Sequence, residues 1–162
     1  MATFNNVVSA WNALSATSLN SLASAGSWYS AAVAPQDSYS RIYDDVIIDC
    51  EFETASGTIG SASPQVTVYI APVNADGTYV DGVGGSGPGT LTPRVASNSP
   101  LLGFVAFSAA AELDSMTFSL KAALGFIPSS FVIWLTNSSG LALASSGNAM
   151  KWAGVQRVLS TP

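Results

Sequence analysis

The stretch VIIDCEFET, residues 46–54, decides the fold because its side chains alternate between apolar and acidic. In an extended chain the two kinds fall on opposite sides: Ile48, Cys50 and Phe52 on one, Asp49, Glu51 and Glu53 on the other. A period of two predicts a half-buried β-strand with one wet face. On this interpretation Cys50 is a core residue rather than a reactive thiol.

Similar runs recur on the C-terminal side of this strand, every 10 to 15 residues or so, with turn-forming residues such as NADG (74–77) and NSSG (137–140) between them. The runs are QVTVYI (65–70), TYV (78–80), LLGFVAF (101–107), SMTFSL (115–120), FVIWLT (131–136), LALA (141–144) and MKWAGVQRV (150–158). LLGFVAF is continuously apolar, which predicts a strand in the interior. Because no long helical pattern separates the runs, we predict an all-β chain, an antiparallel β-sandwich or jelly roll.

Residues 1–34 differ from this domain, which we assign to residues 35–162. Their apolar residues recur at helical spacing, while Ser and Asn of low helix propensity interrupt them. The segment is therefore predicted as a short helix or an extended arm, which packs either on its own domain or on a neighbouring subunit. In the second case the residues expected to contact another subunit or a capsid are Phe4, Val7 (or Val8), Trp11, Leu14, Leu22, Trp28 and Tyr29. A chain without residues 1–30 is then expected to keep its sandwich and lose binding.

A glycine-rich stretch, DGVGGSGPGT (81–90), places Gly82, Gly84 and Gly87 at the spacing of a dinucleotide-binding loop. That motif needs a helix directly after the glycines, and Pro88 and Pro93 prevent one. We interpret residues 81–100 as a flexible Gly/Pro-rich connection that can also contact a partner.

Composition excludes several classes of function. The 162 residues suit one domain, and only 9% of them are charged, with a net charge of −5 from 5 basic and 10 acidic residues. Scattered basic residues argue against nucleic acid binding. The chain has no His and one Cys, so we expect no catalytic residue, no metal, no cofactor and no small-molecule substrate. The apolar runs predict no membrane span, the N-terminus resembles no secretory signal, and synthesis in a cytoplasm is expected.

Two longer stretches carry a resemblance to a family. PQVTVYIAPVNADGTYVDG (64–82) with its Gly-rich loop, and PSSFVIWLTNSSGLALASSGN (128–148), resemble tailed-phage capsid decoration (cement) proteins and related small virion structural proteins. The resemblance implies a non-enzymatic dimer or trimer, made in the host cytoplasm, that binds the major capsid protein on the outer capsid surface and stabilises the shell. It carries over no catalytic residue.

Two other functions stay open. The first is a tail, receptor-binding or carbohydrate-binding β-sandwich module, in which Trp28 or Trp134 would meet a glycan. The second is a small hydrolase that uses Asp49 and Glu51, although one strand face offers no opposing carboxylate.

Overall fold

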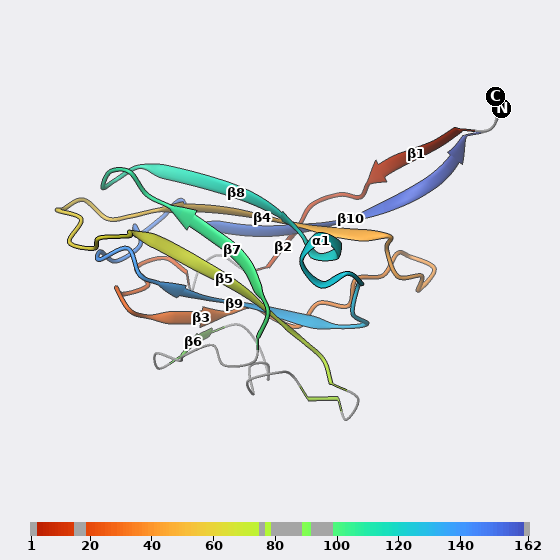
Figure 1. The fold of residues 1–162 in the computed structure, drawn as a ribbon, viewed down its shortest axis with the longest axis horizontal. Helices are drawn as coiled ribbons and strands as arrows, with labels where there is room; N and C mark the ends of the chain where they lie inside the picture. Colours follow the sequence, from red (N-terminus) through yellow and green to blue (C-terminus); the bar gives the residue numbers. More distant parts are fainter. Residues whose placement is uncertain (1–2, 15–18, 75–76, 79–88, 92–98, 161–162) are drawn as a thin grey trace.

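The computed structural model describes residues 3–14, 19–74, 77–78, 89–91 and 99–160, which form two antiparallel sheets packed face to face (Figure 1). The predicted all-β sandwich is confirmed. The first sheet has the order β1-β10-β4-β8, with β2 paired to β10 beside β1. Its strands are β1 (Thr3–Val8), β2 (Asn12–Ala13), β4 (Asp45–Glu53), β8 (Leu113–Ser119) and β10 (Ala149–Ser160).

The second sheet has the order β6-β3-β9-β5-β7. Its strands are β3 (Ser27–Tyr29), β5 (Gln65–Pro72), β6 (Gly89–Leu91), β7 (Leu101–Ala106) and β9 (Phe131–Asn137). If β1 and β2 are counted as one interrupted strand and β6 as an addition, the sheets contain strands 1-8-3-6 and 2-7-4-5 in chain order. This connectivity is the double Greek key of a jelly roll.

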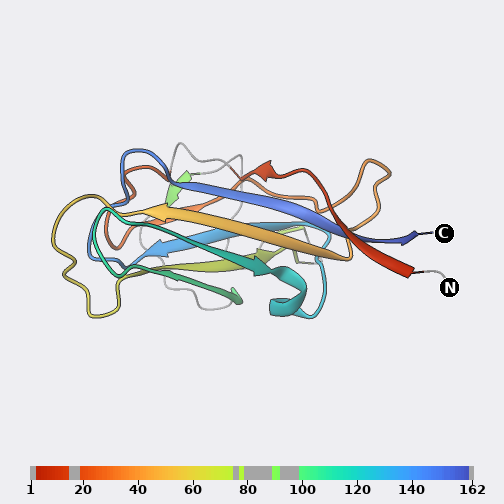
Figure 2. The same cartoon turned by 90° about the horizontal axis from the view of Figure 1, so that it is seen from above.

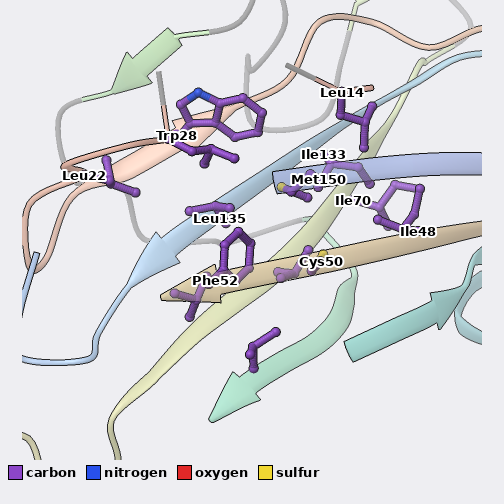
Figure 3. Close-up of a cluster of buried hydrophobic side chains, with 14 of the residues drawn as sticks. Leu14, Leu22, Trp28, Ile48, Cys50, Phe52, Ile70, Ile133, Leu135 and Met150 are labelled. Atoms are coloured by element: carbon purple, nitrogen blue, oxygen red, sulfur yellow. The ribbon is translucent and has the colours of Figure 1, made fainter. Parts of the chain in front are cut away.

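The core lies between the two sheets, and β4 shows how the sequence builds it. Burial alternates residue by residue along this strand, as the pattern in VIIDCEFET predicts. Ile48, Cys50 and Phe52 point inward and meet Ile70, Ile133 and Leu135 of the opposite sheet (Figure 3). Cys50 is fully buried, and burial raises the pKa of its thiol, with the Asp49 carboxylate adding to the effect. It is a core residue, as predicted.

The central strand β9 is buried on both faces, which explains its continuous apolar run. Its outer face forms a second small cluster in which Val132 and Trp134 contact Ala71. The Tyr69 ring stacks on Trp134 with 4.5 Å between ring centroids. Trp134 is therefore fully buried although its side chain points away from the main core.

Three other runs differ from their prediction. LLGFVAF forms β7, an edge strand with half-exposed Leu101 and Phe104, because β5 pairs with one of its edges and no described strand pairs with the other. SMTFSL gives the edge strand β8, and Leu120 already begins the short helix α1 (Leu120–Leu124), which Ser119 caps. LALA makes a single bridge between Leu143 and Thr54 rather than a strand.

The N-terminal segment is not a separate domain. Residues 3–8 form a strand, so the predicted short helix is wrong. β1 and β2 belong to the first sheet, and β3 belongs to the second. The apparent helical spacing has two causes. β1 carries apolar side chains on both faces, and the segment between β1 and β2 has one residue more than the part of β10 opposite it. Leu14, Leu22 and Trp28 are buried in the chain's own core (Figure 3). A chain without residues 1–30 would lose β3 and the buried Trp28, which argues against the expectation that it keeps its sandwich.

The predicted Gly/Pro-rich loop falls largely outside the described residues. Of residues 81–100, the stretches 81–88 and 92–98 are not described, and Gly89–Leu91 forms β6 against β3. At the predicted turn, the Gly77 N–H donates to the Asn74 carbonyl. The returning strand predicted at 78–80 lies mostly outside the described residues.

We predict that Gly154→Ala destabilises the fold by about 1–3 kcal/mol, because an added Cβ would overlap the Tyr43 ring that packs on Trp152. Gly60→Ala is the matched control, since nothing lies within 4 Å of the added Cβ there. Urea denaturation of both variants measures the difference. Equal midpoints for the two variants would contradict this account of the contact.

Candidate assembly interface

The two ends of the chain leave the sandwich together. Val155–Ser160 of β10 pairs with Thr3–Val8 of β1, and β4 pairs with β10 only as far as Val155. Figures 1 and 2 both show this pair of strands extending beyond the body, with the two termini at its tip. We call residues 3–8 and 155–160 the terminal ribbon.

The terminal ribbon is apolar and exposed. Five of its side chains are between 45% and 63% exposed: Phe4, Val7, Val8, Val158 and Leu159. A two-stranded ribbon is marginally stable by itself in water, because it has no third layer to cover its apolar side chains. Clustered exposed apolar side chains mark surfaces that other proteins cover.

Both faces of the terminal ribbon carry these side chains. Directly opposed residues of an antiparallel pair share a face, so Phe4 and Val8 lie on the face of Leu159. Val7 and Val158 lie on the other face. The Arg157 guanidinium stands over the Phe4 ring, 5.3 Å from its centroid. A partner could therefore contact the terminal ribbon from either side.

A bulge separates the terminal ribbon from β2. Residues 9–11 face only two residues of β10, and Ser9 maintains the ladder at this point. Its N–H donates to the Gly154 carbonyl at 2.8 Å, and its hydroxyl accepts from the Gly154 N–H at 2.9 Å. The bulge ends the regular edge of β1 at Val8.

The loop around Asp37 holds the base of the terminal ribbon. The Asp37 carboxylate accepts from the Arg41 guanidinium at 2.6 Å and from the Gln156 amide at 2.8 Å. Beside it lies an open cavity of about 390 Å³, lined by Arg41, Ile42, Asp44, Gln156, Arg157, Val158 and Leu159. Partial burial alone would raise the pKa of Asp37, but hydrogen bonds from Arg41, Gln156 and the Tyr39 N–H hold it well below its usual range.

A second cavity, of about 500 Å³, lies on the outer face of the first sheet and is lined by Trp11, Ala13, Asp49 and Lys151. Around it, Asp49 accepts from the Thr117 hydroxyl at 3.0 Å, and the Lys151 ammonium lies 3.4 Å from Glu51. The acidic side of β4 is thus the wet face of a sheet, as predicted.

The structure separates the seven predicted contact residues. Phe4, Val7 and Trp11 are exposed, and the first two lie in the terminal ribbon. Tyr29 is half-buried beside Trp134 on the outer face of the second sheet. The three that are buried, and so wrongly predicted as contacts, are Leu14, Leu22 and Trp28.

The C-terminal half of the terminal ribbon, including Val158 and Leu159, was not predicted from the sequence. The one indication in the sequence is the apolar pair Val158 and Leu159 after the last predicted turn. Nothing in the sequence shows that β10 continues past the end of its partner β4. Ile42, at the base of the terminal ribbon, was missed for the same reason: its exposure depends on where the strands end.

Comparison of the chain with protein-family models, with curated proteins and with solved structures finds no match. Within the described ranges, no group of three or more His, Cys, Asp or Glu side chains is placed to hold a metal ion. The same residues include no helix with the length and hydropathy needed to cross a membrane.

We predict that Asp37→Asn lowers the denaturation midpoint at pH 7 and that the loss shrinks in acid. The pKa of Asp37 is lower in the folded chain than in the unfolded chain, so its carboxylate stabilises the fold above pH ~3.9. This contribution disappears as the pH falls toward the folded pKa. Urea titrations from pH 7 to pH 2 test it.

Asp114→Asn is the control with the opposite sign. Burial, and then the neighbouring Glu112 carboxylate, raise the pKa of Asp114, so ionised Asp114 opposes folding near neutral pH. Its replacement should not lower the midpoint at pH 7. A pH-independent loss in Asp37→Asn would show that its hydrogen bonds do not depend on ionisation.

Proposed function

We propose that this chain is a non-enzymatic virion structural protein, a capsid decoration (cement) protein that binds the outer surface of a tailed-phage capsid and stabilises the shell. The observation that carries the proposal is the terminal ribbon, which holds five exposed apolar side chains outside the sandwich. Contact with another protein would cover them. Its partners are the major capsid protein and other copies of the chain.

The fold is compatible with this role. Jelly rolls occur in viral capsid proteins, and they also occur in lectins and cupins. Connectivity alone does not define a function, so the proposal depends on the surface that the fold presents. Both chain termini lie at the tip of the terminal ribbon, where a protruding element can reach a neighbouring subunit (Figure 2).

The chemistry of the polar side chains supports a non-enzymatic role. The chain has no His, and the carboxylates of Asp45, Asp49 and Glu51 in β4 take part in contacts within the fold. Asp45 is the clearest case, because it accepts from the Ser119 hydroxyl at 2.7 Å and from the Lys121 N–H at 3.0 Å. Asp45 thereby fixes the start of α1 against the first sheet.

A cement protein can work with a modest interface on each copy. Many copies on one shell act together, so a weak contact repeated over a lattice gives strong overall attachment. A low-charge surface suits this task, since a chain with only 9% charged residues presents little repulsion between neighbouring copies. We place the protein on the outer capsid surface, after synthesis in the host cytoplasm.

We predict that Phe4→Ser reduces binding to capsids at least tenfold, because it removes the most exposed large apolar side chain of the terminal ribbon. Phe126→Ser is the matched control, since Phe126 is similarly exposed but lies just beyond α1. Co-sedimentation with capsids of the phage that encodes the chain measures binding, and capsid melting measures stabilisation. Failure of the parent chain to bind or stabilise these capsids would refute the proposal.

One observation favours a second candidate, a carbohydrate-binding module. Trp28 and Trp134 are fully buried and cannot meet a glycan, but Trp11 is 47% exposed in the outer cavity beside Asp49 and Lys151. An aromatic face with nearby hydrogen-bonding groups is a usual composition for a small-molecule site. We rank this function second because the outer cavity is open to solvent and because glycan binding there would leave the terminal ribbon without a role.

If the chain binds glycans, Trp11→Ala should abolish binding on a glycan array, while Trp152→Phe should retain it. Trp152 is half-buried and packs edge-to-face with Tyr43 on the core side of the sheet. Isothermal titration with the best array ligand gives the affinity. An array without any hit for the parent chain removes this candidate.

A further inference from the structure

The outer edge of β1 has open hydrogen-bonding groups. The Asp44 N–H donates to the Val155 carbonyl, so Val155 directs its backbone toward β4. Strand geometry alternates, so Gln156, Val158 and Ser160 direct their N–H and C=O groups toward β1. Their register partners on β1 are Val7, Asn5 and Thr3. The backbone groups of Phe4, Asn6 and Val8 therefore point away from the chain, along an edge to which no other strand is paired in the described part of the chain.

The other edge of the terminal ribbon is closed differently. The Arg157 N–H, which points away from β1, donates to the Asp44 carboxylate at 2.7 Å. A carboxylate beside an edge strand occupies its donor and places a charge where an approaching strand would lie, which prevents strand addition. Residues 3–8 of β1 contain no charged residue and no proline. The chain thus protects one edge of the terminal ribbon and leaves the other open.

We propose that a second copy of this chain pairs with this open edge, antiparallel, β1 to β1. The longest register that uses all the outward groups centres on Asn6. It pairs Asn6 with Asn6 of the second copy and Phe4 with Val8 in both directions. Each of the three pairs exchanges two N–H···O bonds. Cross-strand pairing of an aromatic with a β-branched residue is favourable, and two opposed amides can hydrogen-bond to each other.

Charge and symmetry on this edge favour a second copy over a different partner. The molecule has a net charge of −5, but the outward-facing residues of β1, Phe4, Asn6 and Val8, are neutral. Two copies can therefore approach along β1 without like charges facing each other. An antiparallel pairing of identical strands has a two-fold axis, so the contact closes on itself and forms a dimer rather than a fibre. The dimer places the two sandwiches at opposite ends of a four-stranded ribbon, which is more stable than a two-stranded one.

This inference refines the proposed function, since it names the partner at one edge of the terminal ribbon. It leaves the faces of the terminal ribbon available to a capsid. The edge can nevertheless be tested on the purified chain alone, without any capsid.

The first test blocks the edge without breaking the ribbon. Asn6→Pro removes an N–H that points outward, and the bonds between β1 and β10 use other residues. Asn6→Ala keeps this N–H and is the matched control. Sedimentation equilibrium should show a concentration-dependent dimer for the parent and for Asn6→Ala, with at least tenfold weaker association for Asn6→Pro. A parent chain that stays monomeric at about 0.5 mM would refute the proposal.

The second test fixes the register and stays informative if Asn6→Pro does not fold. In the proposed dimer the two Asn6 residues face each other within disulfide range, so Asn6→Cys should form a covalent dimer under mild oxidation. The two Val8 residues lie about 14 Å apart, so Val8→Cys should not. The parent is a further control, because Cys50 is buried. Equal cross-linking of the two variants would exclude this register.

The two proposals can fail separately. Chains that stay monomeric but bind capsids through Phe4 would refute β1 pairing and support the cement function. Chains that form the Asn6-centred dimer but do not bind capsids would support β1 pairing and refute the cement function. If Asn6→Pro dimerises as well as Asn6→Ala, the edge is not the contact.

Discussion

The structure depends on the double pairing of β10. Over its first half this strand lies between β4 and the β1–β2 edge and completes the first sheet of the sandwich. Over its second half, β1 is the only strand paired with it among the described residues, because the β4 ladder ends where the Asp44 carboxylate accepts from the Arg157 N–H. One long strand thereby closes the core and carries the terminal ribbon.

The join between the core and the terminal ribbon is built from small contacts. Gly154 leaves room for the Tyr43 ring, and the Ser9 hydroxyl accepts from the Gly154 N–H. Asp37 links Gln156 of β10 to the neighbouring loop through Arg41. These contacts set the direction in which the terminal ribbon leaves the body. A ribbon fixed at its base loses less conformational entropy on binding than a free peptide arm would, so it can serve as a binding element.

The strands of the interior could be predicted from the sequence, and those of the edges could not. β4 alternates strictly because the opposite sheet covers one of its faces, and β9 is apolar from Phe131 to Leu135 because both of its faces are covered. LLGFVAF is equally apolar, but it became an edge strand. Local composition is a poor guide to burial in an edge strand of a sheet, because half-exposed apolar side chains are common there. The spacing of Phe4, Val7 and Trp11 wrongly indicated a helix for a related reason. In a strand that is apolar on both faces and ends in a bulge, apolar residues can also recur every three or four positions.

By itself the sequence determined the class of fold, the core position of Cys50, the wet side of β4 and the scarcity of groups for acid–base chemistry. These properties depend on residue type and on the period of a single strand. Only the tertiary structure decided that Leu14, Leu22 and Trp28 belong to the chain's own core, and that Phe4 and Val7 join Val158 and Leu159 outside it. That outcome depends on which strands pair and where each ladder stops. Residues more than 150 positions apart meet there, and no local pattern records such a contact.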